Sequence, residues 1–176
     1  MTALICTAYL PPIGYMVVLA RHQSALIEAK ETFPKQTYRN RAVIMTAGGL
    51  RDLCVPTLRR NHSRTDEVTI DHRTRWATTH IRTIAAAYNA SPYYMFYRDE
   101  LESLIMQPAE SLLDYNTTLL RWLCKQLKIE CDLSYTTDWQ PIGSTDNDYR
   151  YVFSPKSDQT QIECEPYYQV FADRQP

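Results

Sequence analysis

Hydrophobic and polar residues change their spacing near residue 73 of the chain. Before this point, short apolar runs alternate with turn residues, which is the pattern of buried strands. The runs cover residues 4–8, 25–29, 43–46, 50–56 and 68–71, with Gly48-Gly49 expected as a hairpin turn. Residues 13–21 are apolar and follow Pro12, which predicts a helix with this proline in its first turn.

Beyond residue 73 the apolar positions recur at the spacing of α-helices. The first helix is expected to end near residue 89, with Trp76 and His80 on its apolar side. Further helices are expected over residues 97–105 and 108–127, and the second of these carries Asn116 within a stripe of leucines. His80 and Asn116 are therefore expected to point into the interior of the protein.

The last part of the chain, residues 136–176, is polar and irregular. It contains only weak strand patterns, at residues 149–153 and 167–171. Together the elements predict a single α/β or α+β domain over residues 1–176. In this domain a mixed sheet from the N-terminal half is covered by helices from the middle of the chain.

Composition places the chain among ordinary globular proteins, since 44% of its 176 residues are apolar and 22% are charged. This balance excludes a disordered, fibrous or membrane-embedded chain, and no apolar run approaches the ~18 residues of a spanning helix. Because the N-terminus also lacks a basic start before its apolar run, we expect a cytoplasmic protein without membrane insertion. Five cysteines at irregular spacing predict free thiols and no metal site, and no cofactor-binding motif is present in the sequence.

Charge is distributed unevenly, although the net charge is only −1. Residues 35–82 carry ten basic and four acidic side chains, and nine of the ten basic ones are arginines. Arginine binds phosphate and carboxylate groups through a planar fork, so we expect an anionic small molecule or carrier-linked substrate, such as a sugar nucleotide or an acyl donor. The alternative is that this segment pairs with the acidic residues 83–176. Nucleic acid is not expected, because the chain has no overall basic charge and no recognition motif.

The strongest candidate for an anion site is the run Lys35-Gln36-Thr37-Tyr38-Arg39-Asn40-Arg41. In an extended backbone, Lys35, Arg39 and Arg41 share one side. Gln36, Tyr38 and Asn40 share the other. Cations on one face repel one another unless an anion or solvent compensates, so the run is either an anion-binding segment or a solvated edge strand.

His80 is the candidate general base, because an imidazole titrates near neutral pH. The alternatives are a hydrogen-bonded core histidine and a nucleophilic pair of His80 with Cys6. Five residues are expected to shape the surrounding pocket: Tyr9, Tyr15, Trp76, Tyr88 and Asn116. Tyr9 and Tyr15 belong to a proline-rich corner after the first strand, at the end of the sheet where open α/β folds bind ligands.

Several segments, taken in order, resemble the WbqC-like family, and in particular its shorter Bacteroidetes-type members. They are Ala8-Tyr9-Leu10-Pro11-Pro12-Ile13-Gly14-Tyr15, Lys35 to Arg41, residues 53–56, Trp76 with His80, Ala87-Tyr88, Ser91-Pro92-Tyr93-Tyr94, Tyr97 with Asp99, Asn116, Tyr149-Arg150, Pro155-Lys156 and Tyr167-Tyr168-Gln169-Val170-Phe171. Two features depart from the family pattern. Cys6 and Thr7 stand where other branches often have Gln-Pro, and the sequence ends at Pro176, which makes it resemble a C-terminally short member.

The resemblance implies a bacterial protein of surface-polysaccharide (O-antigen-like) biosynthesis that transfers an aminoacyl or acyl group to an amino sugar. In this hypothesis Lys35, Arg39 and Arg41 bind the anion, and His80 deprotonates the attacking amine. The competing hypothesis is a non-catalytic binding or assembly protein whose arginine-rich segment docks an acidic partner.

Overall fold

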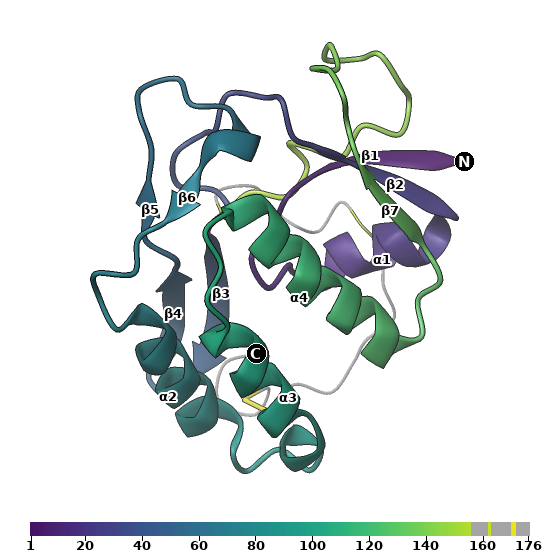
Figure 1. Cartoon of the computed structure of the whole chain (residues 1–176). Coiled ribbons are helices and arrows are strands. Elements are labelled where there is room, and N and C mark those ends of the chain that lie inside the picture. The colour runs from purple at the N-terminus through teal and green to yellow at the C-terminus, as the bar shows by residue number, and fades with distance from the viewer. Residues whose placement is uncertain (156–161, 163–169, 172–176) are drawn as a thin grey trace.

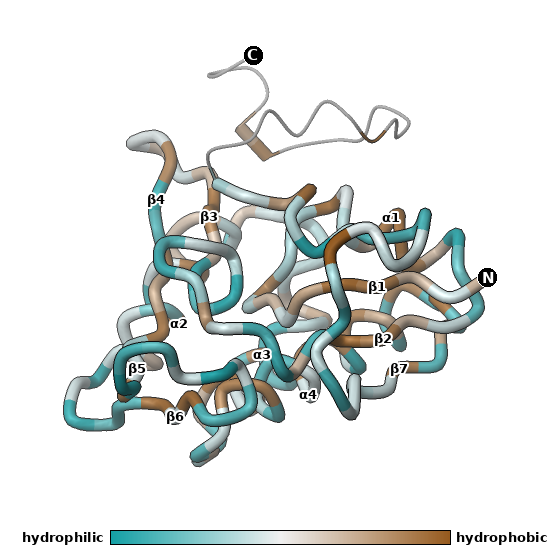
Figure 2. The backbone as a smooth tube through the Cα atoms, turned by 90° about the horizontal axis from the view of Figure 1, so that it is seen from above, coloured by the Kyte–Doolittle hydropathy of each residue, from teal (hydrophilic) through white to brown (hydrophobic). Residues whose placement is uncertain are grey.

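The first part of the fold is a small parallel sheet with a connecting helix. The computed structural model describes residues 1–155, 162, 170 and 171. β1 (Thr2–Cys6), α1 (Ile13–Arg21) and β2 (Ser24–Glu28) follow one another, and β7 (Asp132–Tyr135) adds a third strand in the order β1-β2-β7, with parallel pairing throughout. β1 and β2 are nearly continuous apolar runs, coloured largely brown in Figure 2, which is typical of strands covered by helices.

The second part is built on an antiparallel hairpin. β3 (Arg41–Thr46) pairs with β4 (Gly49–Cys54), and the turn between them occupies residues 47–48. Gly49 begins β4 with φ of 101°, a left-handed conformation that glycine adopts without the steric cost of a side chain. A shorter antiparallel pair, β5 (Thr57–Leu58) with β6 (Thr69–Ile70), encloses the 3-10 helix η1 (Thr65–Glu67).

Three helices complete the fold: α2 (Trp76–Tyr88), α3 (Tyr94–Met106) and α4 (Leu112–Leu127). Figure 1 shows α2 beside the β3–β4 hairpin, while the parallel sheet lies at the opposite side of the view. α4 runs between these parts and buries two faces. Leu113, Leu120 and Cys124 pack into the core around the sheet and α1, and a second set packs into the core around the hairpin, α2 and α3: Leu112, Tyr115 and Leu119.

The predicted α/β class is confirmed, and so is the helix over residues 13–21. The strands are divided among one parallel sheet and two antiparallel pairs, however, and do not form one continuous mixed sheet. α4 begins at Leu112 and not at Pro108, because the Ser111 hydroxyl accepts a hydrogen bond from Asp114 N at 3.1 Å and caps the helix there. α3 begins three residues earlier than predicted, at Tyr94.

The strand predicted for residues 149–153 is wrong. Tyr149 N donates to Leu4 O at 2.8 Å, which makes a single bridge at the free edge of β1, and a turn follows. Of the other predicted strand, residues 167–169 lie outside the described residues, and residues 170–171 form a turn. Within the described parts of the chain, no helix combines the length and the apolar character that crossing a membrane requires.

Candidate functional site

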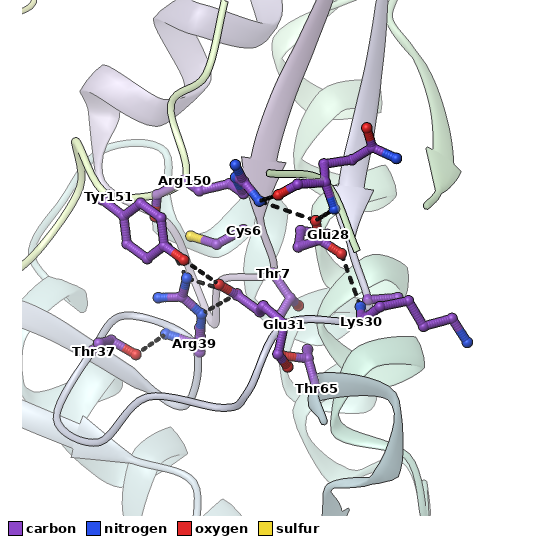
Figure 3. A network of polar contacts seen from close by, with 12 residues as sticks. Cys6, Thr7, Glu28, Lys30, Glu31, Thr37, Arg39, Thr65, Arg150 and Tyr151 are labelled. Atoms are coloured by element: carbon purple, nitrogen blue, oxygen red, sulfur yellow. Dashed lines mark hydrogen bonds and ion pairs between the residues drawn. The ribbon is translucent and has the colours of Figure 1, made fainter. Parts of the chain in front are cut away.

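Charged side chains gather at the carboxyl end of the parallel strands (Figure 3). Glu28 ends β2 and is completely buried, and Glu31 is only 2% exposed. Each has an arginine partner: Arg150 Nη1 lies 3.1 Å from Glu28 Oε2, and Arg39 Nη2 lies 2.7 Å from Glu31 Oε1. A buried carboxylate requires such a partner, so both arginines are engaged within the protein.

The same network fastens the irregular C-terminal part of the chain to the sheet. Arg150 also bonds both carboxylate oxygens of Asp148, and its Nη1 donates to Gln140 O at 2.7 Å. The Tyr151 hydroxyl donates to Glu31 Oε2 at 3.1 Å, and its ring lies 5.8 Å from the Arg39 guanidinium. These contacts occupy the carboxyl ends of the parallel strands, where open α/β folds bind ligands.

Cys6 ends β1 and lies within this network (Figure 3). It is 1% exposed, and burial raises the pKa of its thiol, although the nearby charge of Arg39 opposes the shift. The thiol is therefore protonated and shielded from solvent. For the predicted pair of Cys6 with His80, the contacts of the two residues differ. Cys6 lies near the charges of Arg39, Glu31 and Arg150, whereas His80 contacts Tyr9 and Trp76.

The extended geometry predicted for residues 35–41 is wrong before Arg41. Residues 35–40 form bends and turns, with Gln36 in a left-handed conformation at φ of 58°, and β3 begins at Arg41. Arg39 turns inward to Glu31, while Arg41 Nη1 lies 3.0 Å from Asp52 Oδ2. The three cations therefore do not share one face, and of the three only Lys35 is exposed.

Three more of the predicted site residues make contacts that hold the fold together. Asn116 Nδ2 donates to Arg39 O at 2.7 Å and to Thr7 Oγ1 at 3.0 Å, which ties α4 to the turn of residues 35–40 and to the end of β1. The Tyr15 hydroxyl donates to Cys6 O at 2.7 Å. Asn40 Nδ2 donates to Val55 O at 2.9 Å.

His80 lines a cleft between α2 and the β3–β4 hairpin. The side chain is 4% exposed, its Nδ1 is 2.9 Å from the Tyr9 hydroxyl, and the Trp76 ring meets it edge-on. Burial lowers the pKa of His80 to about 4, and a hydrogen bond with the Cys54 backbone opposes this shift. The ring is therefore neutral at neutral pH, and its contacts also fit the alternative of a core histidine.

Three arginines line this cleft, which has a volume of about 910 Å³: Arg51 from β4, Arg75 at the N-cap of α2, and Arg82 from α2. Within the described chain, no carboxylate lies close enough to pair with any of them. Thr79 and Thr83 also line the cleft, and their hydroxyls donate to backbone oxygens four residues earlier, Arg75 O at 3.2 Å and Thr79 O at 2.8 Å. We call this hollow the arginine cleft.

The sequence contains a signal for these arginines outside residues 35–41. Arg82 and Thr83 follow Thr79 by three and four residues, which places them along one side of α2, and Arg75 precedes Thr79 by four residues at the N-cap of the helix. Arg51 precedes Asp52 in a strand with an exposed side. The polar side of an amphipathic helix usually faces solvent, and here it lines the cleft together with Arg51.

A second cleft, with a volume of about 720 Å³, borders the proline corner after β1. Pro11 and Pro12 form part of its wall, together with Tyr38 and Tyr88. The described lining residues include no charged side chain. We call this hollow the corner cleft.

The predicted site residues therefore lie in different places. The buried contacts at the carboxyl ends of the parallel strands include Arg39, Tyr15 and Asn116. The arginine cleft is lined by His80 and Trp76, and the corner cleft is lined by Tyr38 and Tyr88. Tyr9 connects two of these places, because it follows β1 and also bonds His80. In the part of the chain that is described, no three or more His, Cys, Asp or Glu side chains gather as metal ligands would.

These features define an α/β protein with a buried ion-pair network, the arginine cleft and the corner cleft. The model of the WbqC-like protein family matches residues 7–161, so the chain belongs to this family, as the sequence resemblance predicted. The chain is 28% identical over 141 residues to the uncharacterized protein Rv1507c of Mycobacterium tuberculosis (strain ATCC 25618 / H37Rv), and the match covers 78% of this chain. It spans 61% of that relative's length. No solved structure matches significantly.

Proposed function

We propose that the protein is an acyl- or aminoacyltransferase that binds an anionic, nucleotide- or carrier-linked amino sugar in the arginine cleft. The observation that carries this proposal is the group of three arginines around the neutral His80, with no carboxylate partner in the described chain. A place in surface-polysaccharide biosynthesis is what the family resemblance adds to the proposal.

Charge in the cleft supports an anionic ligand. Arg51, Arg75 and Arg82 bring three positive charges to the cleft, and Asp52, the carboxylate among its described lining residues, is already engaged by Arg41. A ligand with two or more negative charges, such as a diphosphate, would pair with these arginines through charge-assisted hydrogen bonds. The cleft volume of about 910 Å³ lies within the ~300–1,000 Å³ range of small-molecule sites.

His80 is the residue assigned to proton transfer. In the reaction, the amine nitrogen attacks the acyl carbonyl carbon, a C–N bond forms, the bond to the leaving group of the donor breaks, and His80 accepts the amine proton. The low pKa keeps the ring unprotonated. A bound phosphate would raise this pKa by charge attraction, toward the range that a general base requires.

Calorimetric titration with a uridine diphosphate amino sugar tests the binding step. The variants Arg75→Ala and Arg82→Ala should each lower the affinity by about tenfold or more, because each removes a charge-assisted hydrogen bond. Arg60→Ala is the matched control, since Arg60 is exposed and lies outside the cleft. Equal losses in all three variants, or equal binding of the free uncharged sugar, would contradict a specific anion site.

The competing function, docking of an acidic partner through residues 35–41, has less support. Arg39 and Arg41 are engaged by Glu31 and Asp52, which leaves Lys35 as the exposed cation of that segment.

A further inference from the structure

The corner cleft takes no part in the proposed reaction, and the chemistry of its walls differs from that of the arginine cleft. Pro11 and Pro12 come from the corner after β1, and Val43 and Met45 come from β3. Val170 and Phe171 approach from the C-terminal part of the chain. The walls are therefore formed by aliphatic and aromatic side chains from segments that are far apart in sequence.

The β3–β4 hairpin contributes residues to both clefts. Met45 pairs with Leu50, so both lie on the same face of the hairpin as Val43. Ile44 pairs with Arg51, and their side chains lie on the other face. Val43 pairs with Asp52, which lines the arginine cleft, and Ile44 lines the corner cleft, so each cleft receives residues from both faces of the hairpin. The two clefts nevertheless share no described lining residue.

Part of the apolar wall remains in contact with solvent. Leu50 is 68% exposed and Ile13 is 43% exposed, although both line the corner cleft. Hydration of such apolar surface is unfavourable, so an apolar group that entered the cleft would be bound by the release of this water.

We propose that the corner cleft binds a hydrocarbon chain with an uncharged end, such as the acyl chain of an ester or thioester. A charged group would find no counter-ion among the described lining residues. The proposal does not depend on the arginine cleft, which shares no described lining residue with the corner cleft.

A sugar ring is a poorer occupant than a hydrocarbon chain. Each sugar hydroxyl that leaves water needs a hydrogen-bond partner. Ser91 supplies one hydroxyl in the lining, and Tyr38 and Tyr88 already interact with other groups of the protein. The described lining thus satisfies few polar groups, whereas its aliphatic and proline surfaces suit a chain.

The test compares neutral thioesters that differ only in chain length. S-decanoyl-N-acetylcysteamine should bind at least about tenfold more tightly than S-acetyl-N-acetylcysteamine, because additional methylene groups leave water. Decanoate should bind more weakly than the decanoyl thioester, because its carboxylate has no cation in the described lining. Leu50→Asp should remove most of the preference for the longer chain, and calorimetric titration measures each affinity.

Leu58→Asp is the matched control, because Leu58 is an exposed leucine on β5 that lies outside this cleft. It should leave the preference for chain length unchanged. If Leu50→Asp fails to fold, Val43→Thr provides the same test with a side chain of similar size, and it should weaken binding of the decanoyl thioester.

Three outcomes would overturn the proposal: affinity that is independent of chain length, equal effects of Leu50→Asp and Leu58→Asp, or preference for a free neutral sugar. Failure of the proposed transferase function is recognised separately. In that case the uridine diphosphate amino sugar fails to bind, whereas the decanoyl thioester still binds and Arg75→Ala leaves its affinity unchanged.

Discussion

At the residue scale, His80 makes folding stability depend on pH, because its pKa differs between the folded and unfolded states. Burial lowers the folded pKa to about 4, whereas the ordinary value is 6.5. Between these values the unfolded chain binds a proton that the folded protein does not bind, so acid favours unfolding. The stabilisation of the folded state that depends on a neutral His80 is fully present above pH 6.5 and is lost as the pH falls toward 4.

We therefore expect the free energy of unfolding to decrease from pH 7 to pH 4.5, with a contribution from His80 of up to about 3 kcal/mol. His80→Gln keeps a hydrogen-bonding side chain but cannot titrate, so its unfolding energy should depend less on pH. Urea unfolding at both pH values measures the difference. His62→Gln, which changes an exposed histidine, should retain the wild-type dependence; an unchanged dependence in His80→Gln would assign it to other groups.

Burial also explains why Arg39, which the sequence predicts as a ligand-binding arginine, is not available to a ligand, whereas Arg51 is available. Arg39 and Arg51 belong to the same basic segment, and the residues beside them in the sequence do not indicate which of the two is buried. Arg39 is held in the interior by Glu31, a buried carboxylate, whereas Arg51 is exposed on β4 and has no such partner among the described residues. The sequence therefore indicated arginine as the residue type of the anion site. Which arginines can reach a ligand depends on the tertiary position of Glu31, which the sequence does not record.

At the scale of elements, buried ion pairs hold the C-terminal part in place where regular structure is absent. After β7 ends at Tyr135, residues 136–155 contain no helix or strand. Their attachment depends on Arg150, whose guanidinium is completely buried between Glu28 and Asp148. Removing it would leave the buried Glu28 carboxylate without its counter-ion.

Arg150→Ala should therefore lower the free energy of unfolding by about 3–5 kcal/mol, the usual cost of breaking a buried ion pair on one side. Arg98→Ala is the control, because Arg98 forms an exposed pair with Glu102 one helical turn away. Its cost should be only about 0.3–0.5 kcal/mol. Chemical denaturation of both variants measures these changes in the free energy of unfolding. Similar small decreases in both variants would mean that the buried Glu28 carboxylate is stabilised by its other hydrogen bonds.

The elements differ in how much of them is readable from the sequence. Helix α1 and the hairpin strands were predictable, because their apolar periodicity is local. β7 was not, because the short segment Asp132–Tyr135 is largely exposed and forms a strand only by pairing with β2. Its position depends on a partner more than one hundred residues away, which no local pattern records.

At the scale of the whole molecule, α4 links two hydrophobic cores through adjacent residues. Leu119 packs into the core of the hairpin and α2, and Leu120 packs into the core of the parallel sheet and α1. Their exposures are 0% and 2%. Because one helix serves both cores, loss of packing in either should weaken both, which would make the chain a single cooperative unit.

Leu119→Ala and Leu120→Ala should each lower the free energy of unfolding by about 2–5 kcal/mol, the range for a buried leucine. Hydrogen-exchange mass spectrometry of peptides from β2 and α2 tests whether the loss is shared. In a cooperative unit, each variant reduces protection in both peptides to a similar extent. Leu127→Ala, at an exposed position of the same helix, should change little. If Leu119→Ala affected α2 alone and Leu120→Ala affected β2 alone, the two cores would unfold independently, and the single domain predicted from the sequence would be wrong.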